Sequence, residues 1–460
     1  MTVASAYPNY RQPKMRWLPA VPKHWNEQRA KTFFREVDER SKTGQEELLS
    51  VSHLTGVTPR SQKNVTMFKA ASYVGSKLCR PGDIVINTLW AWMAALGTSR
   101  HVGIVSPAYG VYRPHRADSF NPAYLDYLLR TRAYVAEYIG RSTGIRASRL
   151  RLYPNQFLDI TLIQPPRPEQ DQIAAYLRAQ DAHIARFIKA KRGLIKLLTE
   201  QKLRIIDHAV TRGLDASVAL KPSDIEWLGE VPEHWELRRL KFLASNVTYQ
   251  TTTKTSDEIY LAMEHVQSWT GVARPLEGEV QFARTVKRFV ADDVLFGKLR
   301  PYLAKVTRAE RNGVCVSEFL VLRSRKEIIL PAYLEQLLRC KRVIDLINSS
   351  TAGAKMPRAD WSFIGNVRLP VPHKEEQETI LSHIKTETKD LDDAIARTEE
   401  EIKLISEYRD RLITDVVTGQ VDVRGWQPGP DDVVDDAALA ALGDDPDDVT
   451  LEEDGDGEES

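Results

Sequence analysis

Basic and amide side chains gather in five short loops of this 460-residue chain. The loops are TGVTPRSQKNVTMFK (55–69), LGTSRH (96–101), NVTYQTTTKT (246–255), RTVKRF (284–289) and KLRPYLAK (298–305). Lys and Arg neutralise phosphates, and Asn, Gln, Ser and Thr hydrogen-bond to base edges, so these loops predict contacts with a nucleic acid. The candidate contact residues are Arg60, Lys63, Asn64, Lys69, Arg100, His101, Gln250, Thr252, Lys254, Lys287, Arg288, Lys298, Arg300 and Lys305. A solvated loop would explain any one residue alone, so the prediction concerns the set.

The charge distribution is uneven along the chain. Residues 426–460 contain 14 Asp or Glu and no Lys or Arg, although the whole chain carries a net charge of only +1. Residues 1–425 therefore hold 64 basic and 49 acidic side chains, a surplus of about +15. A body this basic suits a polyanionic partner, whereas the acidic end is typical of a disordered, solvated tail. A basic face that binds nothing remains the alternative on charge alone.

Several motifs of catalytic sites are missing. The sequence has no G-x-x-x-x-G-K-[ST] phosphate loop, no G-x-G-x-x-G turn after a strand and no H-E-x-x-H pair. NPAY (121–124) resembles the Asn-Pro-Pro-Tyr motif of amino-methyltransferases, but a second copy of the same segment has LPAY (330–333). Because the asparagine is dispensable, we interpret the motif as a helix start. We predict no catalytic residue in this chain.

The most distinctive phrase of the sequence is stated twice. WLPAVPKHW (17–25) returns as WLGEVPEHW (227–235). His24 and His234 lack a Cys, Asp or Glu cluster at ligand spacing, so a packing or hydrogen-bonding role is favoured over a metal ligand or a base. We predict a structural joint in which the tryptophans bury their rings where helix meets domain. The tryptophans concerned are Trp17, Trp25, Trp227 and Trp235.

The phrase opens a long internal repeat. PGDIVINTL (81–89) aligns with ADDVLFGKL (291–299), keeping the aspartate and the final leucine, and PAYLDYLLR (122–130) aligns with PAYLEQLLR (331–339). An offset of about 210 residues is far too long for a solenoid and indicates two homologous domains. Their short β-rich runs and their proline-initiated helical segments predict α/β (α+β) domains.

Each copy ends in a long amphipathic segment. Apolar residues recur at steps of mostly 4 and 7, and the two stripes match at an offset of 207 residues, as one face of a long helix requires. Each helix would span about 40–45 residues, or on the order of 60–68 Å. The predicted helix-pairing residues are Ile173, Leu177, Ile184, Ile188, Ile195, Leu198 and Ile205 in the first stripe and Ile380, Ile384, Leu391, Ile395, Ile402, Ile405 and Leu412 in the second.

These helices outrun a domain of about 150 residues, so we expect them to pair with one another. An antiparallel coiled coil would separate the two domains and relate them by a pseudo-twofold axis. The predicted boundaries are 1–165 for the first domain, 166–213 for the central helix, 214–370 for the second domain, 371–425 for the C-terminal helix and 426–460 for the acidic tail.

Three scattered cysteines argue against a disulfide framework and against a zinc site. No window is apolar enough for a membrane span, and no signal peptide is evident at the N-terminus. We therefore expect a reduced cytoplasmic protein without a metal site and without a membrane partner.

In this order, the doubled phrases resemble the DNA-specificity subunits of type I restriction–modification systems. The resemblance covers residues 10–425 and includes SEFLVLR (317–323), PPRPEQDQIAAYL (165–177) and EYRDRLITDVVTGQVDVR (407–424). It implies two target-recognition domains, each reading one half of a split sequence in double-stranded DNA, with the helices fixing the gap. It also implies that this chain is not an enzyme. The expected protein partners are two methyltransferase subunits and two ATP-driven restriction subunits, so S-adenosylmethionine, ATP and Mg would bind those partners.

Two other functions remain open at this point. A combined reader and DNA methyltransferase or nuclease would act on DNA without partner subunits, which the missing motifs oppose. A coiled-coil adaptor would bind only proteins. The acidic tail lies outside the resemblance and gains no function from it.

Overall fold

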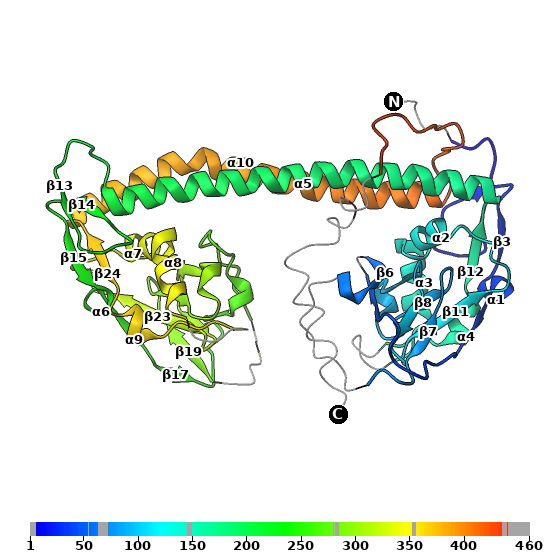
Figure 1. Ribbon diagram of the computed structural model, residues 1–460, viewed down its shortest axis with the longest axis horizontal. Coiled ribbons are helices and arrows are strands. Elements are labelled where there is room, and N and C mark those ends of the chain that lie inside the picture. The colour runs from blue at the N-terminus through cyan, green and yellow to red at the C-terminus, as the bar shows by residue number, and fades with distance from the viewer. Residues whose placement is uncertain are drawn as a thin grey trace. The chain divides into compact units, whose positions relative to one another are not determined.

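The computed structural model describes residues 6–53, 55–62, 72–144, 150–278, 280, 285–351, 356–434 and 439. The chain divides into two compact units, of which the first comprises Met1–Gly193 with Glu399–Ser460 and the second comprises Leu194–Thr398. Each unit contains a β-rich domain with short helices (Figure 1). Each also contains one half of α5 (Arg167–Arg212) and one half of α10 (Lys374–Val417). The prediction of mixed α/β domains joined to long helices is confirmed.

The long helices form where the apolar stripes predict them. Pro168 and Glu169 lie in the first turn of α5, where proline costs no hydrogen bond and an acidic side chain faces the positive end of the helix dipole. Gly213 and Gly419 follow the two helices with φ of +73° and +78°, the left-handed conformation that ends a helix. All fourteen predicted stripe residues are buried or half-buried.

Within each unit the two half-helices run in opposite directions along one another. In the first unit, Asp181 of α5 pairs with Arg409 of α10 at 2.7 Å, and Lys191 pairs with Glu401 at 2.5 Å. The partner number falls as the α5 number rises, which only an antiparallel pair produces. In the second unit, Lys202 of α5 pairs with Asp392, and Val210 further along α5 shares an apolar core with Ile380, so the α10 number again falls as the α5 number rises.

The domain of the first unit is built on a four-stranded antiparallel sheet of order β4-β11-β8-β9. Two-stranded ladders β1-β2, β3-β12, β5-β6 and β7-β10 surround this sheet. The strands are β1 (Tyr10–Arg11), β2 (Val21–Pro22), β3 (Asn26–Arg29), β4 (Phe34–Glu36), β5 (Leu49–Ser52), β6 (Gly56–Pro59), β7 (Lys77–Cys79), β8 (Ile84–Ile86), β9 (Leu96–Thr98), β10 (Gly103–Val105), β11 (Gly110–Pro114) and β12 (Thr161–Gln164). The helices are α1 (Ala30–Phe33), α2 (Pro122–Leu129), α3 (Arg132–Arg141) and α4 (Pro154–Leu158), with 3-10 turns η1 (Arg60–Gln62) and η2 (Ala91–Met93).

The second unit repeats this plan with a sheet of order β16-β23-β20-β21 and adds a second sheet, β17-β19-β22-β18, whose β18-β22 pair is parallel. The strands are β13 (Leu220–Pro222), β14 (Glu230–Pro232), β15 (Glu236–Arg239), β16 (Ala244–Val247), β17 (Gln250–Thr251), β18 (Ile259–Leu261), β19 (Val286–Phe289), β20 (Val294–Gly297), β21 (Val306–Arg308), β22 (Gly313–Cys315), β23 (Phe319–Ser324) and β24 (Arg368–Val371). The helices are α6 (Leu240–Leu243), α7 (Pro331–Arg339), α8 (Lys341–Ser349) and α9 (Trp361–Ile364), with η4 (Met263–His265) and η5 (Pro301–Leu303).

The central sheets of the two units share their register as well as their strand order. Val85 faces Val111 in the first sheet, and Leu295 faces Val321 in the second, in each case 210 residues further along the chain. All four side chains are fully buried, as expected for strands covered on both faces. Both ends of each long helix join an apolar core. The start of α5 (Ile173) and the end of α10 (Val416) belong to the core of the first unit, and the end of α5 (Val210) and the start of α10 (Ile380) belong to the core of the second.

The four tryptophans of the repeated phrases do not all bury their rings as predicted. Trp25 and Trp235 are buried and Trp227 is half-buried, but Trp17 is 49% exposed, with the guanidinium of Arg16 over its ring at 5.1 Å. Trp227 instead packs on the apolar core of its unit.

The acidic tail begins later than predicted. Trp426 packs edge-on against Tyr176 of α5 at 5.4 Å, and Asp432 pairs with His183 at 2.8 Å. These contacts hold residues 426–432 against the helix. The rest of the predicted tail, apart from residues 433, 434 and 439, lies outside the described residues.

Within the described part of the chain, no helix is both long enough and apolar enough to cross a membrane.

Candidate nucleic-acid interface

The loop after β20 presents Lys298 and Arg300 on a fixed backbone. The Arg300 amide donates to the carbonyl of Pro357, and the Ala359 amide donates to the carbonyl of Lys298, so a second segment braces the loop. Arg300 is exposed and adopts φ of +50°, a strained conformation for a residue with a Cβ. Lys298 is half-buried and forms no ion pair with any described residue. A cationic pair held rigidly at a loop is suited to phosphate or base-edge contacts.

A strained turn occupies the same place in both domains. Ala94 ends η2 with φ of +62°, and Ala304 ends η5 with φ of +47°, 210 residues later. The side chains on the two turns differ, since Trp90 and Trp92 of the first correspond to Arg300 and Tyr302 of the second. The backbone is thus repeated while the groups that it presents are not.

Two predicted contact residues point inward. Lys287 is 9% exposed, and its Nζ donates to the carbonyl of Phe319 at 2.8 Å. Burial, together with the nearby charge of Lys298, lowers the pKa of Lys287. The repeat contained the signal for this outcome, because Lys77 occupies the equivalent position and donates to the carbonyl of Tyr109 at 2.8 Å. Lys287 is therefore a structural residue, and its assignment to DNA contact is wrong.

Lys305 is also engaged by the protein. Its Nζ donates to the carbonyl of Met263 at 2.6 Å, and the side chain is half-buried. The Lys305 ammonium braces η4 against the start of β21, so it faces the protein.

The edge of the second sheet gathers four other candidates. Gln250 and Thr252 are exposed, and Lys254 donates to the neighbouring carbonyl of Thr255 at 3.0 Å. Arg288, on the adjacent strand β19, forms an ion pair with Glu258 at 2.8 Å and lies over the ring of the exposed Tyr249 at 5.9 Å. The charge of Arg288 is therefore already balanced, whereas the amide and hydroxyl groups beside it are accessible.

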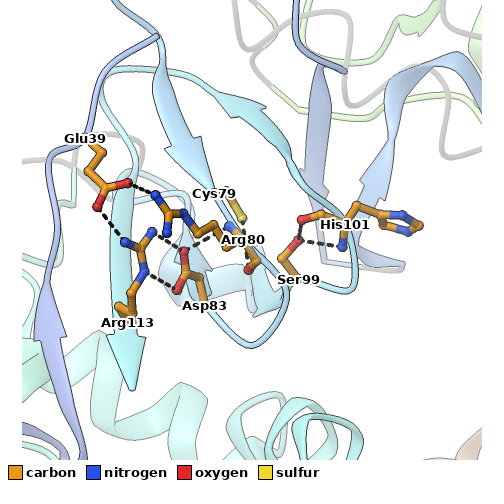
Figure 2. A network of polar contacts seen from close by, with 7 residues as sticks. All are labelled: Glu39, Cys79, Arg80, Asp83, Ser99, His101 and Arg113. Carbon is orange, nitrogen blue, oxygen red and sulfur yellow. Dashed lines mark hydrogen bonds and ion pairs between the residues drawn. The ribbon is translucent and has the colours of Figure 1, made fainter. Parts of the chain in front are cut away.

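Fewer of the predicted DNA-contact residues of the first unit lie within the described part of the chain. Arg100 is exposed, and His101 is half-buried in the loop after β9. In Figure 2, the Ser99 hydroxyl donates to the His101 carbonyl at 2.8 Å and accepts from the His101 amide at 3.1 Å. Arg60 is half-buried in η1. Lys63, Asn64 and Lys69 lie outside the described residues.

An ionic brace that the sequence reasoning missed supports this loop region. Asp83 is 1% exposed and accepts two hydrogen bonds from Arg113, at 2.9 and 3.0 Å (Figure 2). These bonds raise the pKa of Arg113, and its hydrogen bond to Glu39 lowers the pKa of that carboxyl. Asp293 and Arg323 repeat the pair at 2.7 and 2.9 Å. The aspartate kept in the aligned strands was the available signal, and its role is to hold the backbone of the preceding turn.

The cysteines and one serine motif offer no nucleophile. Burial raises the pKa of Cys79 to about 12, and that of Cys315 to about 12. GRSTG (140–144) has the spacing of a nucleophile elbow, but Ser142 caps the end of α3 instead of sitting on a strand-to-helix turn. Within the described ranges, no group of three His, Cys, Asp or Glu side chains is placed to hold a metal ion.

The repeated phrases meet the long helices within each unit. Asn121 caps α2 by accepting from the amides of Ala123 and Tyr124, so NPAY starts a helix. His24 and Trp25 both contact the carboxylate of Glu169, at 2.9 Å each. His234 and Trp235 contact Glu376 at 2.8 and 2.9 Å. Both carboxylates lie in the first turn of a long helix, and their partners come from segments more than 140 residues away in the chain.

No family model matches the chain. Among curated proteins, the type I restriction enzyme EcoDI specificity subunit of Escherichia coli is 21% identical over 225 residues, covering 47% of this chain and 48% of that protein. The type I restriction enzyme MjaVIII specificity subunit of Methanocaldococcus jannaschii is 23% identical over 319 residues, covering 65% of this chain and 70% of that protein. The chain thus spans about half the length of the first relative.

Solved structures give a matching fold. A chain from a structure of a type I R-M system, described in terms of complex assembly and conformational transition, aligns with a TM-score of 0.56 at 15% identity, over 87% of this chain and 99% of that chain. The HsdS subunit from Thermoanaerobacter tengcongensis aligns at 16% identity over 87% and 98%, with a TM-score of 0.38 that is too low to add to the comparison. The resemblance to type I specificity subunits is confirmed by the curated relatives.

Proposed function

We propose that this chain recognises a bipartite, asymmetric DNA target with its two α/β domains and serves as the assembly scaffold of a type I restriction–modification complex. The observation that carries the proposal is a repeated framework with diverged loops. The central sheets share strand order and register, whereas Arg300 and Tyr302 on one turn correspond to Trp90 and Trp92 on the other. Two domains that share a backbone framework but present different side chains to DNA are suited to two half-sites of different sequence. The names of the curated relatives, all specificity subunits, support the same function.

The long helices would set the distance between the half-sites and offer a docking surface to partner subunits. The ion pairs between α5 and α10 within each unit support the pairing of the two helices along one another. Phe187 on α5 and Leu404 and Tyr408 on α10 are exposed apolar side chains of the first unit, and each could contact a partner subunit. Two methyltransferase subunits and two restriction subunits are the proposed partners, and they would carry S-adenosylmethionine, ATP and Mg.

A band-shift experiment with the purified chain, alone and with methyltransferase subunits, tests the function. We expect a sequence-specific shift of double-stranded DNA, without methyl transfer or cleavage by the chain alone. Methyl transfer or cutting by the isolated chain would instead indicate a combined reader and enzyme. A chain that shifts no DNA even with its partners present would be a protein adaptor.

The spacing role has a separate test. Inserting four residues, about one helical turn and about 6 Å, into the exposed stretch around Gly193 of α5 should change the spacer that the complex accepts. An unchanged spacer would refute the idea that the helices measure distance.

A further inference from the structure

A carboxylate in the first turn of each long helix grips the domain of its own unit. In the second unit, Glu376 of α10 accepts a hydrogen bond from Trp235 Nε1 at 2.9 Å through one oxygen and contacts His234 Nε2 at 2.8 Å through the other. Trp235 is fully buried, and the His234 side chain is 41% exposed. Because both oxygens are held by neighbouring residues of one strand end, the carboxylate cannot rotate without breaking a contact.

The first unit contains the same arrangement 207 residues earlier. Glu169 accepts from Trp25 Nε1 at 2.9 Å and contacts His24 Nε2 at 2.9 Å, and the Tyr7 hydroxyl adds a third contact at 2.5 Å. Glu169 is 6% exposed, so its charge depends on these partners. Burial, together with the hydrogen bond to Glu169, raises the pKa of Tyr7, which therefore stays a donor.

The same tryptophans also touch the other long helix of their unit. A Cβ added at Gly213, where α5 ends, would lie 3.2 Å from the ring of Trp235, and one added at Gly419, after α10, would lie 3.0 Å from the ring of Trp25. The Trp235 indole is thus held between the start of α10 and the end of α5.

Neighbouring side chains complete the junction. Gln377, next to Glu376, accepts from the Leu330 amide at 2.8 Å and donates to the carbonyl of Ile328 at 2.9 Å. The hydroxyl of Tyr333, from the repeated Pro-Ala-Tyr, donates to the carbonyl of Val210 on α5 at 3.3 Å. Each hydrogen bond joins the domain to a defined point on a long helix, so together they fix an angle as well as an attachment.

We propose that Glu169 and Glu376 are positioning residues, whose grip on the His-Trp pair sets the angle of each domain on the long helices and thereby the half-site spacing that the protein accepts. This inference rests on the proposed function. Two properties of the molecule would then determine the accepted half-site spacing: the length of the helices and the stiffness of the junctions at their ends. A looser junction would let a domain reach a half-site displaced by one base pair.

The test measures methylation by the full chain with its methyltransferase subunits. The substrates are duplexes with the native spacer and with spacers one base pair shorter and longer. The variant Glu376→Ala should lower the preference for the native spacer at least about fivefold, the factor expected when one net hydrogen bond is lost, with the preferred half-site bases unchanged. Glu375→Ala is the matched control, since Glu375 lies in the same helical turn, carries the same charge and is exposed.

Two further variants separate geometry from charge and from folding. Glu376→Gln keeps an oxygen for Trp235 and an N–H for His234, so it should retain the spacer preference within about twofold. His234→Ala removes one contact from a half-exposed side chain and leaves the buried indole in place, so it should fold and relax the preference about threefold.

The possible results separate a failure of the positioning role from a failure of the proposed function. A Glu376→Ala protein with the spacer preference of Glu375→Ala overturns the positioning role, as does a Glu376→Gln protein as relaxed as the alanine variant. A wild-type complex that methylates no bipartite site at all overturns the proposed function itself.

Discussion

The ion pair between Asp181 and Arg409 offers the sharpest test of how the two long helices hold together. Asp181 is 5% exposed, and its carboxylate accepts from Arg409 Nε at 2.7 Å, from Arg409 Nη2 at 3.1 Å and from the Tyr127 hydroxyl at 2.7 Å. It therefore ties α5 to α10 and to α2 of the first domain. Asp181→Ala would leave a guanidinium and a hydroxyl without their acceptor.

We expect Asp181→Ala to lower the local stability of the first unit by about 3 kcal/mol, the low end for breaking a buried pair, because Arg409 keeps 30% of its side-chain exposure. Glu401→Ala breaks the half-exposed pair with Lys191 between the same two helices and should cost about 0.5 kcal/mol. Removing both charges with Asp181→Ala and Arg409→Met should restore much of the loss, since no unpaired charge remains.

Hydrogen exchange read by mass spectrometry measures this effect in the first unit alone. Amides of residues 173–190 should exchange roughly a hundredfold faster in Asp181→Ala, as a loss of about 3 kcal/mol implies, and only a few-fold faster in Glu401→Ala. If the two single variants exchanged alike, or if the double variant were less protected than Asp181→Ala, the carboxylate would not be the tie that we infer.

Three further predictions concern the junction, the thiols and the DNA contacts. Gly419→Ala places a Cβ 2.4 Å from Pro22 at φ of +78° and should lower the free energy of unfolding by about 1–3 kcal/mol, whereas Gly425→Ala meets open space and should change it by less than about 0.5 kcal/mol; equal melting temperatures would contradict this. Since its pKa is raised to about 12, Cys79 should stay protonated and unreactive toward a thiol reagent at pH 8 until the protein unfolds, and rapid labelling of the folded chain would show that the site is open. Replacing Lys298 and Arg300 by alanine should weaken DNA binding and reduce the slope of log K against log salt by about 1–2, with Lys326→Ala, whose exposed side chain pairs with Asp292, as control; normal affinity at low and moderate salt would remove this pair from the interface.

The sequence was most informative where one physical requirement repeats many times. Two stripes of seven apolar residues each, at helical spacing, predicted α5 and α10, because each turn of a paired helix must bury the same face. The doubled phrases predicted two related domains in a similar way, because the same junction between helix and domain occurs twice and needs the same residues each time. These patterns need no knowledge of which segments meet in space.

Side-chain direction was the part that the pattern could not supply. Lys287 looks like a surface cation, yet its long stem carries the ammonium to a backbone carbonyl inside the domain. Trp17 and Trp227 occupy the same position of the repeated phrase. Trp227 lines a pocket together with Leu346 and Phe363, two apolar residues that are distant in sequence. Glu169 and Glu376 read as ordinary first-turn acids, because their partners lie more than 140 residues away in the chain. Each outcome depends on neighbours distant in sequence, which a single sequence does not reveal.

The most direct test of the central claim is the DNA methylation pattern of the host, sequenced with and without the gene for this chain. Because the two domains share a framework but present different side chains to DNA, we expect deletion of the gene to abolish methylation at one bipartite motif. The two halves of that motif should differ in sequence and be separated by a fixed unspecified gap. An unchanged methylation pattern, or the loss of a single continuous or palindromic motif, would contradict the account.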